Sequence, residues 1–226
     1  MPDIFQILAG KSYVTKFCAQ QVFGIVEPAQ THLMAYAKGL SSGEWERNPH
    51  LQAEVVSDVD VAFAPIDHNS DYESWLQASD HKCDGIVYNA AEHIVVFVEL
   101  KDRKLTNVNI DAVAAACVDD STRLQLDEAL RDLWLPKAVI QLAETVRRFG
   151  QSNPGECNVL CSVHWACVAN RQCGYGVEFS SAAVKECFHK ITGFNLLVNT
   201  CIRIQRPPSP ITFRLLNDRL IREITE

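Results

Sequence analysis

The chain has 226 residues, of which 47% are hydrophobic and 22% charged, and its net charge is −7. This length and composition are typical of one globular domain with a large core, and the acidic balance argues against indiscriminate nucleic-acid binding, which needs clustered Lys and Arg. The sequence has no apolar run near the ~18 residues of a membrane span and no N-terminal basic segment followed by a long apolar one, so we expect a cytoplasmic protein without membrane association.

The first 82 residues are predicted to form two helices, one strand and a loop. Apolar residues recur at helical spacing over residues 3–24, and a second helix is predicted over residues 28–38, with Pro28 in its first turn. Apolar alternation predicts a strand over residues 53–65. The polar stretch 66–82 predicts a loop with a short helical turn.

A hairpin is predicted next. Two apolar runs rich in β-branched residues, 85–88 and 94–100, flank the short segment 89–93, which has little strand propensity. If the turn is symmetric within this segment, Asp84 lies directly opposite Glu99, with both side chains on the same face of the hairpin.

The predicted face carries two acids and a base. Facing carboxylates with Cβ atoms about 5 Å apart repel each other unless a cation lies between them. Mg²⁺ is the natural candidate, because proteins hold it with one or two carboxylates plus water and substrate phosphates. Side-chain alternation adds Lys101 to this face and turns Leu100 toward the core.

An Asp followed by Glu-x-Lys at the end of an apolar strand resembles the PD-(D/E)XK nuclease superfamily. Cys83 stands where the family motif has Pro. The resemblance implies a restriction-endonuclease-like α/β fold, with a mixed central sheet flanked by helices and an antiparallel hairpin that carries the site. It also implies Mg²⁺ (or Mn²⁺) held by Asp84, Glu99 and the backbone carbonyl of Leu100, with Asp84, Glu99 and Lys101 as the catalytic residues.

The resemblance suggests three accessory residues. In some family members an acid from a helix before the sheet completes the metal shell, which makes Glu27 and Glu54 candidates, with a surface or capping role as the alternative for each. Other members place a Gln from the helix after the hairpin on the scissile phosphate. Gln141 lies on a predicted helix over residues 136–149, but Thr145 stands where the family pattern has an aromatic residue, so we expect Gln141 to face solvent.

The rest of the chain is predicted to continue the α/β pattern. Further helices are expected over residues 110–118 and 180–191, and further strands over residues 157–168 and 194–204. The segment Arg206-Pro-Pro-Ser-Pro is a stiff connector. We therefore expect one nuclease-like domain over residues 1–206 and a C-terminal arm over residues 207–226.

Nine cysteines are present, an odd number that argues against a complete set of disulfides, and most lie in apolar runs. We expect reduced, mostly buried thiols. The alternative is a zinc site drawn from His81, Cys83, Cys157, Cys161, His164 and Cys167. This alternative is disfavoured because a strand would point His164 away from the neighbouring cysteines.

These observations favour a metal-dependent endonuclease that hydrolyses phosphodiester bonds, in DNA rather than RNA. Five arginines against one acid over residues 201–222 are suited to a phosphate backbone or to a solvated face. The acidic net charge predicts a homodimer or a subunit of a larger complex, and analogy suggests restriction or antiphage defence. The alternative is a non-catalytic, nuclease-like binding or assembly subunit that docks through its C-terminal arm.

Overall fold

The computed structural model describes residues 4–30, 32–73, 81–101, 134–151, 163–170, 194–199 and 201–204, together with positions 76, 188, 189 and 192. The predicted helix over residues 110–118, most of the predicted helix over 180–191, the connector and the C-terminal arm lie outside these residues. Within the described part, no helix is both long and apolar enough to cross a membrane.

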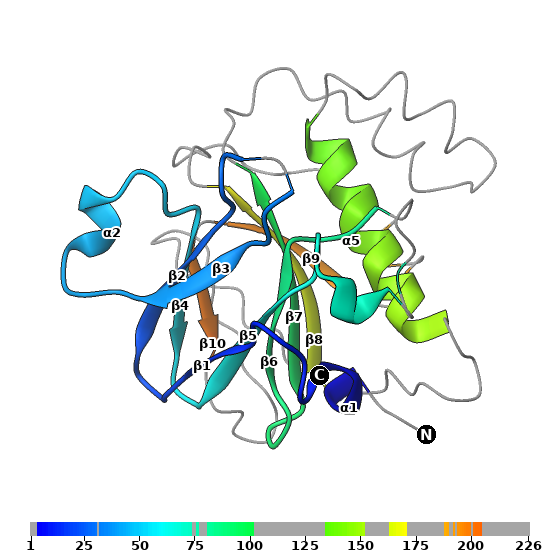
Figure 1. Ribbon diagram of the computed structural model, residues 1–226, viewed down its shortest axis with the longest axis horizontal. Helices are drawn as coiled ribbons and strands as arrows, with labels where there is room; N and C mark the ends of the chain where they lie inside the picture. Colours follow the sequence, from blue (N-terminus) through cyan, green and yellow to red (C-terminus); the bar gives the residue numbers. More distant parts are fainter. Residues whose placement is uncertain are drawn as a thin grey trace.

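A six-stranded mixed sheet forms the centre of the molecule (Figure 1). Its strands, in spatial order, are β1 (Thr15–Phe17), β5 (Val61–Pro65), β6 (Gly85–Asn89), β7 (Ile94–Lys101), β8 (Val163–Asn170) and β9 (Asn195–Asn199). The first four pair antiparallel, whereas β7, β8 and β9 run parallel. A parallel pair needs a crossover connection, and the helix α5 (Trp134–Gln151) lies between β7 and β8 in the chain.

A second sheet has four strands, and it was not predicted. In spatial order they are β10 (Cys201–Ile204), β4 (Ala53–Ser57), β2 (Val22–Val26) and β3 (Tyr36–Gly39). The strand β10 pairs parallel to β4, and the other pairs are antiparallel. The α/β class is therefore confirmed. Among the described residues, helices cover one face of the central sheet and the second sheet covers the other.

The six-stranded sheet separates two cores. On one face Ile86 and Phe97 pack with apolar residues of α5 and of the short helix α1 (Ile4–Leu8). On the other face Val87 and Val98 pack against the second sheet. Figure 1 shows α1 and α5 on one side of the central strands, and the second sheet with α2 (Glu44–Arg47) on the other. A 3₁₀ turn, η1 (Ser70–Tyr72), follows β5 and buries Tyr72 in the helical core.

Of the two helices predicted before residue 40, the described residues confirm only the part that forms α1. Residues 15–17 and 22–26 are strands, and the end of the predicted helix 28–38 is the strand β3. Phe17 and Val22 match helical spacing by coincidence, since turns with positive φ at Tyr13 and Gln20 separate these short strands. Phe23 and Ile25 alternate toward the core between the sheets, which is the strand periodicity that decides the structure.

Two other predicted strands are divided between the sheets. The stretch 53–65 breaks at residues 58–60, so β4 belongs to the second sheet and β5 to the first. The stretch 194–204 breaks after Asn199, so β9 and β10 also lie in different sheets. The strand predicted over 157–168 is described from Val163, as β8.

The predicted hairpin register is confirmed. Gly85 pairs with Val98, and Asn89 pairs with Ile94 at the turn. Gly85 is required by a close approach, because a Cβ atom there would lie 2.4 Å from two ring carbons of Phe63. This register places Asp84, one residue before β6, next to the end of β7 that carries Glu99.

Candidate active site

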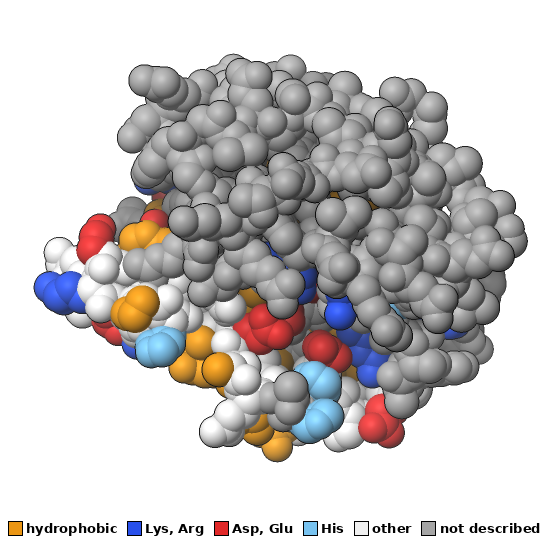
Figure 2. All heavy atoms as spheres, turned by 90° about the horizontal axis from the view of Figure 1, so that it is seen from above, with side chains coloured by type: hydrophobic (Ala, Val, Ile, Leu, Met, Phe, Trp, Pro, Cys, Tyr) orange, Lys and Arg blue, Asp and Glu red, His pale blue; other side chains and the backbone are white. Residues whose placement is uncertain are grey.

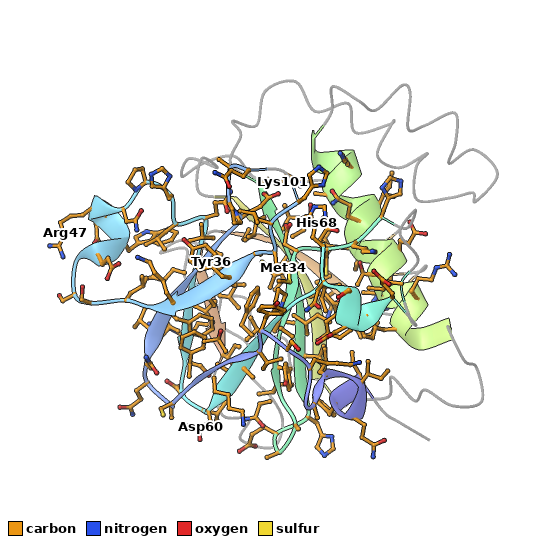
Figure 3. The ribbon with its side chains drawn as sticks, viewed as in Figure 1. Met34, Tyr36, Arg47, Asp60, His68 and Lys101 are labelled. Carbon is orange, nitrogen blue, oxygen red and sulfur yellow. The ribbon has the colours of Figure 1, made fainter. Side chains whose placement is uncertain are left out.

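The predicted acids and lysine lie at one end of the central sheet. Glu99 and Lys101 end β7, and they share the face of Phe97, which points toward α5. Leu100, between them, is fully buried in the core shared with the second sheet, as predicted. Lys101 and His68 are labelled at this end in Figure 3, whereas Asp60 marks the opposite end.

Both acids are buried. Glu99 is 0% exposed and Asp84 is 5% exposed. Lys101 Nζ donates a hydrogen bond to Glu99 Oε1. The backbone N–H of Leu100 donates to Asp84 Oδ2 at 2.6 Å. The other oxygen of Glu99, Oε2, is buried and has no hydrogen-bond partner among the described residues.

Burial dominates the electrostatics of the two carboxyl groups. It raises the pKa of Glu99 from its ordinary 4.5 to about 7, because the opposing effect of Lys101 is smaller. Burial and the neighbouring charge of Glu99 also raise the pKa of Asp84, against the effects of Lys101 and of the Leu100 N–H. Burial lowers the pKa of Lys101, but Glu99 and Asp84 outweigh it and the net shift is upward. The charges of Asp84, Glu99 and Lys101 therefore influence one another's pKa values.

Two further acids lie within electrostatic range. Glu27 follows β2 of the second sheet, and its charge helps to raise the pKa values of Asp84 and Glu99. Asp67, in the loop after β5, also raises the pKa of Glu99. The candidate Glu27 is therefore near the site, although it follows a strand and not a helix. Asp67 was missed because nothing in its sequence context indicates which loop faces the hairpin.

Glu54 is not brought to the site. It lies within β4, where it pairs with Gly24 and Cys201. Its neighbours Ala53 and Val55 are buried in the core between the sheets. Alternation therefore turns Glu54 to the outer face of the second sheet.

Helix α5 holds the segment that precedes Asp84. Gln141 Nε2 donates to the carbonyl of Lys82 at 3.0 Å, and the N–H of Cys83 donates to Thr145 Oγ1 at 2.8 Å. On the same helix, Glu144 Oε2 accepts a hydrogen bond from the N–H of His81 at 3.2 Å.

The expectation that Gln141 faces solvent is therefore wrong. Its Oε1 atom is buried without a partner in the described part of the chain, and Glu144 on the same helix is 6% exposed. Residue spacing could not reveal this role, because the partners are backbone groups of a distant loop. We name Gln141, Glu144 and Thr145 the α5 clamp.

Replacing Thr145 with Val is expected to destabilise the protein by about 1 to 3 kcal/mol, because it keeps the shape but leaves the buried N–H of Cys83 without an acceptor. Urea unfolding monitored by circular dichroism measures the change. Thr145→Ser, which keeps the hydroxyl, is the matched control and should retain most of the stability. Equal losses in both variants would show that packing, and not this hydrogen bond, is the cause.

The donor set fits a hard divalent cation. Asp84 and Glu99 offer carboxylate oxygens, and the orphaned Oε2 of Glu99 is a buried acceptor that a cation would satisfy. Among the described residues, no three His, Cys, Asp or Glu side chains are grouped so that they could hold a metal ion. A cation here would therefore depend on two acids, the Leu100 carbonyl and water, which is the sparse ligand set that Mg²⁺ accepts.

Without a cation, the stability of the protein is expected to fall as the pH rises. The raised pKa of Glu99 makes the folded state hold a proton that the unfolded chain releases, so this contribution is full below pH 4.5 and is lost through pH 7. Between pH 5 and pH 8, Glu99 should account for a loss of about 2 to 3 kcal/mol in the free energy of unfolding. Urea titrations in EDTA, compared with Glu99→Gln, isolate this slope. An unchanged difference between the two proteins across this range would contradict the buried, protonated Glu99.

Of the nine cysteines, the structure describes the side chains of three, which lie in three different surroundings. Cys83 lies in the helical core and Cys167 in the core between the sheets, while Cys18 is exposed; all three are free thiols. Burial raises the pKa of Cys83, which suits a packed thiol and not a reactive one. Cys157 and Cys161, with the side chain of His164, lie outside the described part of the structure.

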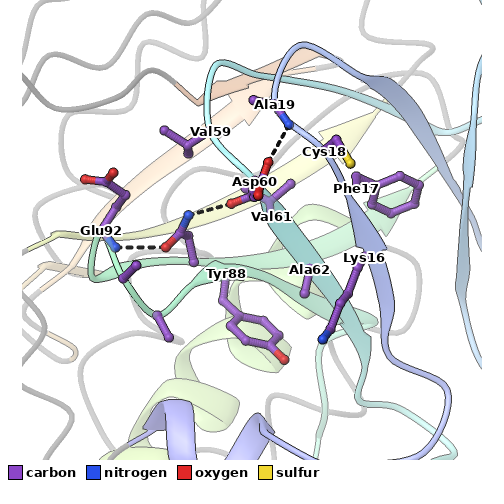
Figure 4. Close-up of a pocket in the computed structure, with 13 residues that line it drawn as sticks. Lys16, Phe17, Cys18, Ala19, Val59, Asp60, Val61, Ala62, Tyr88 and Glu92 are labelled. Carbon is purple, nitrogen blue, oxygen red and sulfur yellow. Dashed lines mark hydrogen bonds between the residues drawn. The ribbon is translucent and has the colours of Figure 1, made fainter.

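A cavity of about 560 Å³ lies at the opposite end of the sheet, near Asp60 (Figure 4). It is lined by β1, by the neighbouring part of β5 and by the hairpin turn. The carboxylate of Asp60 accepts a hydrogen bond from the N–H of Ala19 at 2.7 Å. The backbone carbonyl of Asp60 accepts one from the side-chain amide of Asn89 at 2.5 Å. None of the predicted site residues lines it.

Comparisons with protein-family models, with curated proteins and with solved structures found no match.

Proposed function

We propose that the chain is a divalent-metal-dependent nuclease that hydrolyses phosphodiester bonds, with DNA favoured over RNA as the substrate. The observation that carries the proposal is the orphaned Oε2 of Glu99, a fully buried carboxylate oxygen beside a second buried acid and a paired lysine. Burying a charged group costs several kcal/mol, and Lys101 pairs only one oxygen of Glu99, so a site of this kind is typical of function and not of stability.

The topology also supports a restriction-endonuclease-like arrangement. The strands β5, β6 and β7 form an antiparallel meander, and β8 returns parallel to β7 with α5 packed against both. The acids and the lysine, which resemble the PD-(D/E)XK motif, lie at one end of this meander. The resemblance covers the arrangement of β5 to β8 with α5, and it does not extend to the second sheet.

Each residue has a defined task in this proposal. Asp84, Glu99 and the carbonyl of Leu100 would hold the ion, and Glu27 would join them through water. A bound Mg²⁺ or Mn²⁺ lowers the pKa of coordinated water and neutralises charge on the phosphate. Lys101 orients the attacking water and stabilises the negative charge that develops on the phosphoryl oxygens. The α5 clamp keeps Asp84 in place while the ion and substrate exchange.

The partners follow from charge. Because the chain is acidic as a whole, it would engage nucleic acid through a local basic surface or through other subunits, which favours a homodimer or a subunit of a cytoplasmic complex. A role in restriction or antiphage defence is an analogy with the resembled family.

A second candidate function is a non-catalytic, nuclease-like binding or assembly subunit. One observation favours it: Lys101 and the Leu100 N–H already compensate one oxygen of each acid. In this alternative the ion pair is structural, and adding Mg²⁺ would change neither stability nor any activity.

A cleavage assay separates the two functions. Purified protein is incubated with supercoiled plasmid, linear duplex, single-stranded DNA and RNA, with Mg²⁺ or Mn²⁺, and with EDTA as the control. Metal-dependent cleavage of any of these that Glu99→Gln abolishes supports the nuclease. Absence of cleavage, together with no Mg²⁺-induced rise in the thermal unfolding midpoint, would favour the binding subunit.

A further inference from the structure

Two histidines from distant loops meet at the acid end of the molecule. His32 lies in the segment between β2 and β3, and His68 in the loop after β5. Their ring centroids are 5.6 Å apart and the rings are nearly perpendicular, at 77°. His68 Nε2 lies 3.4 Å from Asp67 Oδ2. His68 therefore contacts both the ring of His32 and the carboxylate of Asp67.

This pair lies on the Glu99 side of the site. The carboxylate that contacts His68 is Asp67, the same group whose charge raises the pKa of Glu99. Figure 2, seen from the Lys101 end, shows histidine side chains next to acidic ones on the surface. The side chain of His68 remains 42% exposed, so its imidazole is accessible to solvent.

Both histidines have left-handed backbone. His32 has a φ of 78° and His68 a φ of 58°, and His is, with Asn and Asp, among the residues other than Gly that adopt this region most often. Tyr13, Gln20 and His93 also have positive φ. The role proposed below therefore depends on the contacts of the two side chains and not on their backbone.

We propose that His68 is the general acid that protonates the leaving oxygen during phosphodiester hydrolysis, positioned by Asp67 and His32. This inference rests on the proposed nuclease function. It adds a catalytic residue, because Lys101 is assigned to the attacking water and to the phosphoryl charge, which leaves the departing oxygen without a donor. General acids of this kind contribute a rate factor of about 10² to 10⁴.

The step balances as a hydrolysis. The oxygen of a water molecule forms a bond to phosphorus while the bond from phosphorus to the bridging oxygen breaks. The electron pair of that bond stays on the bridging oxygen, which takes the proton of the His68 imidazolium. The attacking water loses its own proton to solvent, and His68 regains one from solvent.

The test is a change of leaving atom. Once product ends have identified the bridging oxygen that departs, that oxygen is replaced with sulfur in a synthetic oligonucleotide, because a thiolate leaves without needing a proton. The variant is His68→Asn, since Asn tolerates left-handed backbone and cannot donate as an acid. The control is His50→Asn, an exposed histidine beside α2.

With the oxygen substrate, His68→Asn should cleave about 10²-fold or more slowly than wild type, and with the sulfur substrate within about threefold of it. His50→Asn should match wild type on both, and His68→Asn should bind Mg²⁺ as wild type does by calorimetry. Equal slowing on both substrates, no slowing on either, or weakened Mg²⁺ binding would overturn the assignment. If wild type cleaves neither substrate, the proposed nuclease function itself fails, which is a separate result.

Discussion

Replacing Glu99 with Gln is expected to abolish both Mg²⁺ binding and cleavage, while the metal-free protein at pH 8 stays at least as stable as wild type. The substitution keeps the shape of a side chain that is 0% exposed and removes only its charge. Without that charge the site loses one of its two carboxylate ligands, and Asp84 loses the neighbour whose charge raises its pKa. The variant also avoids the cost of deprotonating a buried acid.

Calorimetry and thermal unfolding with and without Mg²⁺ measure this result. At a concentration about 100 times its dissociation constant, Mg²⁺ should stabilise wild type by about 2.7 kcal/mol and the variant not at all. The matched control is Glu46→Gln, an exposed acid on α2, which should respond to Mg²⁺ as wild type does. Unchanged Mg²⁺ binding by Glu99→Gln would remove Glu99 from the cation site and favour the binding subunit.

Replacing Lys101 with Ala is expected to slow cleavage by about 10² to 10³, the usual loss for one preorganised electrostatic contact in a transition state. The ion pair with Glu99 adds a second effect. Because Lys101 lowers the pKa of Glu99, its removal should raise that pKa further and weaken Mg²⁺ binding near neutral pH. Raising the pH in saturating Mg²⁺ should then restore binding but not the rate.

Two measurements separate these effects. Calorimetry from pH 7 to pH 9 follows Mg²⁺ binding, and single-turnover cleavage at the same pH values follows the chemical step. Lys101→Met, which keeps the aliphatic stem, controls for lost packing in a side chain that is 18% exposed. Cleavage that recovers fully at high pH would mean that Lys101 acts only by keeping Glu99 ionised.

The hairpin and its register could be predicted because the information is local. Two apolar runs and a short turn that is symmetric about its centre leave one pairing, and the position of the acids follows from that pairing. The helix α5 was likewise predictable from its periodicity, to within two residues at each end.

The second sheet and the outer part of the site could not be predicted. The strands β1, β2 and β3 are three to five residues long, which is too short for alternation to outweigh accidental helical spacing. Asp67 and His68 lie in a polar loop whose position depends on contacts with other loops. The α5 clamp acts on backbone groups, and no pattern of side chains reports such partners.

The described strands pass between the two sheets three times, from β1 to β2, from β4 to β5 and from β9 to β10, and these crossings lie at both ends of the sheets. The first lies near Asp60, whose carboxylate accepts the N–H of Ala19. The step from β4 to β5 is near Asp60, far from the acids, whereas β9 passes to β10 at the end where β7 finishes. The N–H of Asp58 also donates to the carbonyl of Ile204 at 2.7 Å. Two layers joined by the chain at both ends cannot swing apart about a single hinge. We therefore expect Glu27, which directly follows β2 of one layer, to stay near Glu99 of the other, and any substrate to enter through movement of the loops.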